Sequence, residues 1–524
     1  MQSILQIRRI QQQASSGSKY DIKEKSLGDE KQGLPADSTT PEDRTPSNQE
    51  HTIVTFNGPD DQENPQNWPA SKKAIVTIFL SAIGFVVGFG SSIDTAVVPQ
   101  ASEHFHISDV SESLATTLFL VGFGVGAPFA GPLSESFGRN PIYIVTLALF
   151  CCWILGAALA PNLGAQLVFR FLAGLFGGTP FTTSGGTMGD IFNHQTRGKV
   201  FPFFACAAFT GPMLGPVVGG YVGHSGIDWR WCEWITLCMA GTLLILMVLF
   251  LPETCAPVIL AWKAKALRSA TGNRNIRGPL EAAGATSLKQ KLALALSRPF
   301  LILFTEPLVI AFTGYLSLVY MVMFSFFASA PFVFGGTYGF NEGASYLMFV
   351  DIAVGLFIAT LATPLFGILV KKEYVKAAAQ GKSHADPEAM LWWAMIGAPF
   401  LPASLFWMGW SAYPSVSYWS PMIAAAVFGF SVLLIFISTY AYLIQTFVQL
   451  AASALVSITL VRYILGGCMV TISIPMYKNL GVHRSLTILA AIACAFTPIP
   501  YVLYLYGGRA RAASKRAPQP QPKV

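Results

Sequence analysis

Five ionisable side chains lie inside long apolar stretches of the sequence, where carboxyl groups can take up and release protons and arginines require a partner. They are Asp94, Arg170, Glu306, Asp351 and Arg462. Charged groups are costly in hydrocarbon, so residues of this kind mark proton or substrate paths by default. A carboxyl group in an apolar surround favours its protonated form, so Asp94 is a candidate to accept a proton; a hydrated position at the mouth of a path explains it equally well. Glu306 fits a helix cap or anchor as well as a path.

An acid and a base share a glycine-punctuated turn between two apolar runs, in the segment 131–141 (GPLSESFGRNP). Gly131 and Gly138 allow tight backbone paths and a close approach of helices. Glu135 and Arg139 can hold neighbouring helix ends together in one conformation and release them in another. The segment therefore predicts a hinge and latch at a membrane surface.

A second segment, 211–220 (GPMLGPVVGG), combines prolines with glycines at four-residue spacing. Prolines remove backbone donors and bend a helix, and the glycines make a flat face on which another helix packs closely. The residues are Gly211, Pro212, Gly215, Pro216 and Gly219. They predict either a functional packing motif or a kinked packing helix with no further role.

The composition places the elements that carry these residues in a lipid bilayer. The chain has 524 residues, of which 53% are hydrophobic and 12% charged, and its mean hydropathy is +0.51. So few charges cannot cover a soluble globule of this size. The net charge of +7 comes mainly from the tails and alternate loops, which indicates membrane topology and no nucleic-acid partner. The eight cysteines fall mostly in apolar runs and predict small core residues.

About twelve apolar stretches divide into two groups of six, each stretch having roughly the 20 residues that cross about 30 Å of hydrocarbon. The first group begins near residues 74, 113, 141, 166, 200 and 231, and the second near residues 301, 343, 391, 418, 450 and 485. A long polar connector separates the groups. The sequence predicts a disordered cytoplasmic tail over 1–72, six-helix halves over 73–251 and 300–507, a cytoplasmic linker over 252–299, and a cytoplasmic tail over 508–524.

Lysine and arginine side chains gather in alternate loops, which predicts that both termini lie in the cytoplasm. The loops expected outside hold only Arg230, Lys478 and Arg484. The loops expected inside hold Arg139, Arg197, Lys199, Lys263, Lys265, Arg268, Arg274, Arg277, Lys289, Lys291, Arg298, Lys371, Lys372, Lys376 and Lys382. The segment 367–372 (GILVKK) is a partial echo of 131–141 and indicates two related halves. A glycine followed by lysines at a helix end explains it as well.

Together these motifs resemble the major facilitator superfamily, and specifically its fungal drug:proton antiporters with twelve spans. The segments 131–139, 170–174 (RFLAG) and 211–220 are similar to that family's loop between spans two and three, its fourth-span motif and its antiporter motif in span five. The fungal branch is matched by 64–68 (NPQNW), 229–231 (WRW), 251–254 (LPET), 306–307 (EP) and 451–454 (AASA). The chain departs from the pattern at Glu135, where an aspartate is usual, and at Asn140, where a basic residue is common.

The resemblance implies an all-α integral membrane protein with the twelve-helix major facilitator fold. It implies alternating access, in which proton entry drives export. In this interpretation Glu135 and Arg139 meet Asp190 and Arg197 at the inner helix ends and close the outward-facing state.

The same resemblance assigns Arg170 to proton coupling. An arginine within the membrane requires a partner, for which Asp94 is a candidate. Glu306, Asp351 and Arg462 form the corresponding set of candidates in the second half.

We expect a proton-coupled secondary transporter that exports a small organic molecule, such as a drug, toxin, polyamine or secondary metabolite, across the plasma membrane. The expected partners are this substrate, protons and the bilayer, and the chain is expected to act as a monomer without cofactor or metal. Alternatives are a proton-coupled or facilitated carrier of an organic acid or polyamine at the plasma or vacuolar membrane, and a non-transporting sensor.

Two enzyme-like interpretations are weaker than transport. The near-match to a phosphate loop, 381–383 (GKS), lacks the leading glycine and a preceding strand, so ATP is not the expected energy source. His104 and Asp109 have a spacing that a membrane acyltransferase could use, but a solvated outward loop explains the pair. We therefore expect no catalytic residues and no enzyme activity.

Overall fold

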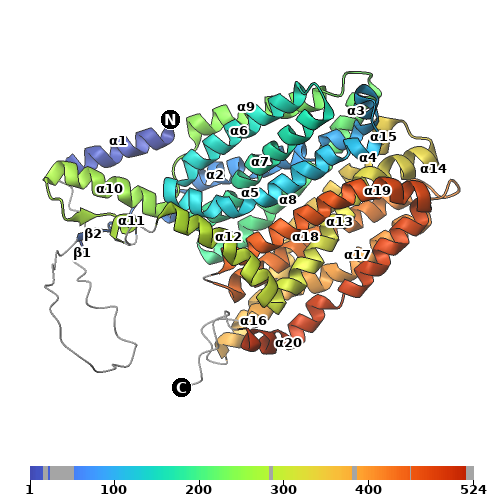
Figure 1. Cartoon of the computed structure of the whole chain (residues 1–524). Coiled ribbons are helices and arrows are strands. Elements are labelled where there is room, and N and C mark those ends of the chain that lie inside the picture. Colours follow the sequence, from blue (N-terminus) through green and yellow to red (C-terminus); the bar gives the residue numbers. More distant parts are fainter. Residues whose placement is uncertain are drawn as a thin grey trace, which may run out of the picture.

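The computed structural model describes residues 1–15, 22–23, 52–58, 60–282, 287–379, 386–448 and 450–514. These residues form a long bundle of helices with one small sheet beside it (Figure 1). Ten helices in this part of the chain are long and apolar enough to cross a membrane. The last of the ten covers 62 residues and is interrupted at Gly481, which has φ 77° and ψ 171°, so it comprises two spans.

One further helix has the length of a span but a less apolar composition. This helix, α7 (Leu163–Ile191), has 29 residues and carries Gln166, Arg170 and several glycines and threonines. With α7 and the division at Gly481, the described residues contain twelve helices that can span a membrane. The all-helical membrane fold predicted from the sequence is confirmed.

The spans follow one another in two sets of six. The first set is α2 (Ala70–Gly90), α5 (Leu114–Phe137), α6 (Arg139–Ala158), α7, α8 (His194–His224) and α9 (Trp231–Phe250). The second set is α13 (Pro307–Ala330), α16 (Met348–Ala379), α17 (Trp392–Ser411), α18 (Trp419–Thr446), α19 (Ala451–Phe496) and α20 (Ile499–Ala513), with the last span formed by the end of α19 and α20.

The bundle has two distinct ends (Figure 1). At the linker end lie the elements between the two sets of spans: α10 (Ala256–Thr271), β3 (Ile276–Arg277), α11 (Pro279–Ala282) and α12 (Leu288–Thr305). Of these, α10 and α11 are labelled on the left and α12 below the centre of Figure 1. At the opposite, far end lie α3 (Val98–Phe105), α4 (Asp109–Glu112), α14 (Gly336–Tyr338) and α15 (Glu342–Ser345). The remaining short helices are η1 (Pro65–Asn67), η2 (Ile93–Ala96), η3 (Pro331–Gly335) and η4 (Pro387–Leu391).

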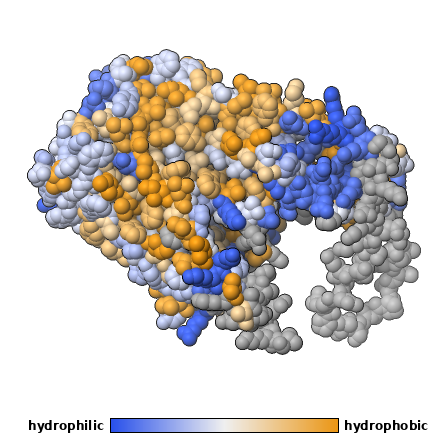
Figure 2. Space-filling model, turned by 180° about the vertical axis from the view of Figure 1, so that it is seen from behind, coloured by the Kyte–Doolittle hydropathy of each residue, from blue (hydrophilic) through white to orange (hydrophobic). Residues whose placement is uncertain are grey.

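Large apolar side chains cover much of the outer surface of the bundle (Figure 2). Ile245, Phe304 and Leu365, for example, expose 62%, 76% and 66% of their surface. Exposure of this kind is unfavourable in water and suits hydrocarbon. Hydrophilic residues gather at the linker end, on the right in Figure 2. The surface therefore matches a protein immersed in a bilayer.

Part of the segment expected to be a disordered tail is folded against the linker. α1 (Gln2–Ser15) packs on α10, and β2 (Thr52–Val54) pairs with β1 (Ile22–Lys23) and, in parallel, with β3. Ile10, Val54, Ile259, Leu267 and Ile276 belong to the apolar cluster that holds these elements together. Residues 16–21, 24–51 and 59, and residues 515–524 of the expected C-terminal tail, lie outside the described part of the chain.

The two segments proposed to echo each other differ in backbone conformation. Residues 367–372 lie inside α16, which continues as a helix to Ala379. In the first set, the chain turns at Gly138, whose φ of 101° is accessible to glycine without strain. The echo therefore does not form a second copy of this turn. Lys382, and the side chain of Lys376, lie outside the described residues.

Candidate functional site

Arg170 forms the centre of a buried charged cluster between the first-set helices. Its guanidinium lies 2.9 Å from Asp94 Oδ2 and 3.4 Å from Glu233 Oε1, and its Nη1 donates to the carbonyl oxygen of Gly90 at 2.9 Å. The ring of Phe119 covers it at 4.7 Å. The structure thus brings together Asp94 and Arg170, the pair that the sequence suggested, and adds Glu233.

The local backbone explains why these side chains converge. α2 ends at Gly90, and the chain then tightens into η2, which directs Asp94 back toward α7. Glu233 lies in the first turn of α9. Gln166 lies one helical turn before Arg170 on the same face of α7, and its Nε2 donates to Glu112 Oε1 at 2.8 Å. The cluster therefore extends from α9 through α7 to α4 at the far end.

The charges of this cluster do not balance. Asp94, Glu112 and Glu233 are buried carboxyl groups, exposed by 5% or less, and Arg170 is fully buried. If all ionised, they would leave two uncompensated negative charges in a buried site, which is costly. One oxygen of Glu112 and one of Glu233 have no hydrogen-bond partner among the described residues. The arrangement can therefore hold and release protons.

A second network fixes the turn between α5 and α6 at the linker end. Arg139 Nε lies 3.0 Å from Asp190 Oδ2, and Arg139 Nη1 donates to Ser134 Oγ. The ion pair expected between Arg139 and Asp190 is thus present in the structure. Glu135 is exposed, and neither it nor Arg197 forms an ion pair with a described residue. The cluster of four charges implied by the resemblance is therefore reduced to one pair.

Glu253 occupies the centre of this network instead. Its carboxyl group accepts hydrogen bonds from four backbone N–H groups, those of Arg139 at 2.9 Å, Asn140 at 3.2 Å, Thr254 at 3.0 Å and Cys255 at 2.8 Å. Burial raises the pKa of Glu253 above its usual value, and the four N–H donors oppose this rise. The residue connects the start of α6 to the segment that joins α9 and α10.

The remaining turn residues make room for this contact. Gly138 precedes α6, and a Cβ atom there would lie 2.6 Å from Glu253 Oε2. Asn140 Nδ2 donates to the carbonyl oxygen of Leu251. Asn140, at the position where the family commonly has a basic residue, therefore makes a specific contact with the backbone of residue 251. We refer to Arg139, Asn140, Asp190 and Glu253 as the linker-end latch.

The glycines of the segment 211–220 bring α8 into close contact with α2 and η2. A Cβ atom at Gly211 would lie 2.3 Å from the carbonyl oxygen of Phe85, and one at Gly219 would lie 2.2 Å from that of Ile93. Ser92 Oγ donates to the carbonyl oxygen of Pro212 at 2.8 Å. Gly215 lies between these contacts, and Pro216 follows it within the same helix. Close packing of α8 thus supports the turn that carries Asp94.

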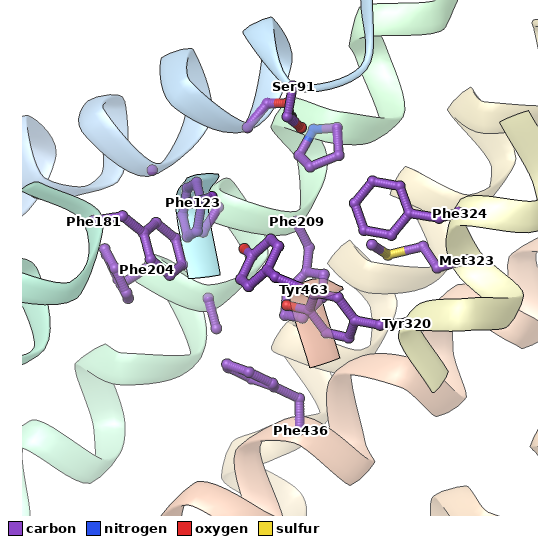
Figure 3. A pocket seen from close by; sticks show the side chains of 15 residues that line it. Ser91, Phe123, Phe181, Phe204, Phe209, Tyr320, Met323, Phe324, Phe436 and Tyr463 are labelled. Atoms are coloured by element: carbon purple, nitrogen blue, oxygen red, sulfur yellow. Dashed lines mark hydrogen bonds between the residues drawn. The ribbon is translucent and has the colours of Figure 1, made fainter. Parts of the chain in front are cut away.

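Aromatic side chains from both sets of helices meet around a small central cavity (Figure 3). The cavity has a volume of about 20 Å³, which accommodates about one water molecule. Its lining includes Phe123, Phe204 and Phe209 from the first set and Tyr320, Met323, Phe324, Phe436 and Tyr463 from the second.

Contacts between the two sets close the cavity on both sides. Toward the far end, Thr117 Oγ1 donates to the carbonyl oxygen of Gly467 at 2.8 Å. Toward the linker end, the ring of Phe201 lies 6.3 Å from that of Phe436 and 6.0 Å from that of Tyr440. The structure is therefore an occluded form, and a substrate can enter only if the sets move apart.

The other predicted residues lie apart from the first-set cluster. Glu306 precedes α13 and accepts a hydrogen bond from Ser514 Oγ at 2.6 Å, which fits the anchor interpretation. Asp351, in the first turn of α16, forms no ion pair with a described residue. Arg462 is fully buried beside the central cavity, among aromatic rings.

Sequence reasoning missed Glu112, Glu233 and Glu253 as site residues. Glu233 is an ionisable residue within an apolar run, so the rule that selected Asp94 would also have selected it. Glu112 lies in a polar segment, where nothing in the sequence distinguishes it from a solvated residue. Glu253 was recognised only as part of the 251–254 match, because its backbone partners are distant in sequence.

Comparison with known proteins identifies the family to which this architecture belongs. The model of the Major Facilitator Superfamily matches residues 80–471. The chain belongs to the major facilitator superfamily. It is therefore a membrane transporter and not an enzyme.

Individual members of the superfamily agree with this assignment. The MFS-type transporter kojT of Aspergillus flavus is 50% identical over 467 residues, which cover 89% of this chain and 83% of kojT. The multidrug transporter mdrA of Aspergillus fumigatus is 34% identical over 451 residues, covering 86% of this chain and 74% of mdrA. The proton:xylose symporter XylE shares the fold, with a TM-score of 0.59, 15% identity and coverage of 84% of this chain and 96% of XylE.

Proposed function

We propose that this transporter exports a small organic molecule, of the drug or secondary-metabolite class, in exchange for protons. The observation that carries the proposal is a buried cluster of three carboxyl groups. Asp94 and Glu233 lie within 3.4 Å of Arg170, and Glu112 is bound by Gln166, one helical turn from Arg170. A group of this kind has more acids than its cation can neutralise, so its charge depends on bound protons. The multidrug transporter mdrA, a relative at 34% identity, supports the substrate class.

Alternating access supplies the proposed mechanism. The two six-helix halves, over 73–251 and 300–507, rock about the central cavity, which is open to one side of the membrane at a time. The linker-end latch holds the ends of α5, α6, α7 and α10 together in one state and releases them in the other. A protonated cluster and an ionised cluster favour different states, which couples proton entry to export.

The proposed orientation places the linker end in the cytoplasm, together with both termini. The basic side chains of the linker support this orientation, because loops rich in lysine and arginine stay inside. We assign the protein to the plasma membrane, as a monomer. Glu112 then lies near the external end of the proton site, and Asp94, Arg170 and Glu233 lie deeper.

Export measured in cells tests this proposal. Extracellular and intracellular small molecules are compared between a host without the gene and one that overexpresses it, with and without a protonophore. We expect export to stop when the proton gradient collapses, and the Arg170→Ala variant to reach the membrane without exporting. Export that continues without the gradient, or that Arg170→Ala leaves unchanged, would contradict proton coupling through this cluster.

A further inference from the structure

Arg462 is a buried cation with no counter-charge among the described residues. It lies in α19, its surface is fully buried, and it forms no ion pair with any described residue. Its Nε, Nη1 and Nη2 atoms have no hydrogen-bond partner of ordinary geometry in the described part of the chain. Arg170, the buried arginine of the first set, has two carboxyl groups and a carbonyl oxygen within 3.4 Å.

Four aromatic rings enclose the guanidinium of Arg462. Their centroids lie at 4.5 Å for Tyr320, 5.2 Å for Phe436, 5.5 Å for Tyr440 and 5.2 Å for Tyr463. The negative faces of such rings attract a cation and offset part of its desolvation. They supply no net negative charge, however, so the buried guanidinium still lacks the partner that buried charges have in folded proteins.

The position of these rings connects Arg462 to the central cavity. Tyr320, Phe436 and Tyr463 line the cavity (Figure 3). The same three rings surround the guanidinium of Arg462. In this occluded form they are covered by rings of the first set. Phe123 stacks on Tyr463 at 4.2 Å, and Phe209 contacts Tyr320 at 5.8 Å and Phe436 at 4.8 Å. Separation of the two sets would remove this cover and open the aromatic cage toward the cavity.

We propose that Arg462 binds the anionic group of the substrate, and that the substrate is a small, flat organic acid. Its ionised carboxylate, enol or phenol would accept hydrogen bonds from the guanidinium, and its ring would stack between Tyr320, Phe436 and Tyr463. A guanidinium presents several donors in one plane, which suits a planar anion. This inference rests on the proposed transport function and deepens it by naming the substrate class.

Equilibrium binding to the purified full-length protein tests the inference with a matched pair of probes. 2-Naphthoate and 2-naphthamide have nearly the same shape, but only the first carries a negative charge at neutral pH. We expect the wild type to bind the acid at least about tenfold more tightly than the amide, because hydrogen bonds to charged groups are the stronger ones. A wild type with no preference for the acid, including one that binds neither probe, would overturn the proposal.

Two substitutions locate the preference at Arg462. Arg462→Met should bind acid and amide about equally, and Arg462→Lys should keep part of the preference, because it keeps the charge but loses the planar donors. An Arg462→Met protein that keeps the full preference would overturn the assignment. If Arg462→Met does not fold, Arg462→Lys decides, because an unchanged preference there contradicts a role for the guanidinium.

Chloride is the other anion that could neutralise Arg462, so the titrations are repeated with gluconate in place of chloride. We expect the acid preference in both buffers. The opposite result has two parts: the preference for the acid is lost in chloride, and chloride alone stabilises the wild type but not Arg462→Met. This result would assign the site to an inorganic anion and overturn the proposal of an organic acid. These titrations need no proton gradient, so their failure is distinguishable from failure of proton-coupled export.

Discussion

The linker-end latch predicts that Glu253→Ala opens the segment between α9 and α10. The substitution removes the acceptor of four buried backbone N–H groups. Leaving a buried donor unsatisfied costs about 1–3 kcal/mol, and water can reach some of the four once the side chain is gone. If two stay unsatisfied, the closed latch loses about 3 kcal/mol, which raises the open population roughly a hundredfold.

Cys255 reports this opening. In the closed latch the residue is 2% exposed, and burial raises the pKa of its thiol to about 11, so little reactive thiolate is available. In the open segment the thiol reaches water and regains its ordinary pKa near 8.5. The rate of maleimide labelling therefore measures the opening equilibrium. The assay uses a protein in which the other seven of the eight cysteines are replaced.

A second glutamate of the linker provides the matched control. Glu281 pairs with Arg268 at 2.7 Å on the surface, and exposed pairs contribute about 0–1 kcal/mol. Glu281→Ala should therefore leave the labelling of Cys255 within about twofold. Unchanged labelling in Glu253→Ala, or an equal rise in Glu281→Ala, would refute the view that Glu253 fastens the latch.

Two further predictions concern packing and the linker. Gly211→Ala should destabilise the purified protein by about 1–3 kcal/mol, because its Cβ would lie 2.3 Å from a carbonyl oxygen of α2. Gly241 has open space around it, so Gly241→Ala should be tolerated. Equal thermal unfolding of the two variants would contradict this prediction. Burial raises the pKa of Asp61, but backbone N–H donors and Lys263 outweigh it and lower the pKa below its usual value. The ionised carboxylate therefore stabilises the fold above about pH 4, and this stabilisation is lost as the pH falls through the lowered pKa. Hydrogen exchange of residues 60–68 should therefore show an acid-dependent loss of protection that Asp61→Asn lacks, and identical profiles would exclude it.

The fold and part of the site were predictable because they depend on local sequence properties. Apolar length identified the spans, and ionisable residues inside them identified Asp94 and Arg170, which the structure places 2.9 Å apart. Glycine spacing identified the face of α8 at Gly211 and Gly219. Each of these features depends on residues that are close together in the sequence, so it can be recognised without knowing which distant segments are in contact.

The contacts that sequence reasoning missed join segments distant in the chain. Glu253 binds backbone N–H groups of residues 139 and 140, more than a hundred positions earlier. Every residue except proline has a backbone N–H group, so the amino-acid types at these positions do not reveal the contact. Glu135 carries the negative charge expected in the latch, yet the residue is exposed. The folded contact of α1 with α10 depends on apolar side chains in a segment whose average composition is polar.

The central claim is that export is coupled to protons through the cluster at Arg170. The direct test places the compound identified in the export comparison outside inside-out membrane vesicles and imposes a pH gradient of either sign. We predict accumulation against the compound's own gradient when the lumen is acidic, none when the gradient is reversed, and none with Arg170→Ala. Equal accumulation in both directions of the pH gradient, or accumulation by Arg170→Ala, would contradict the account.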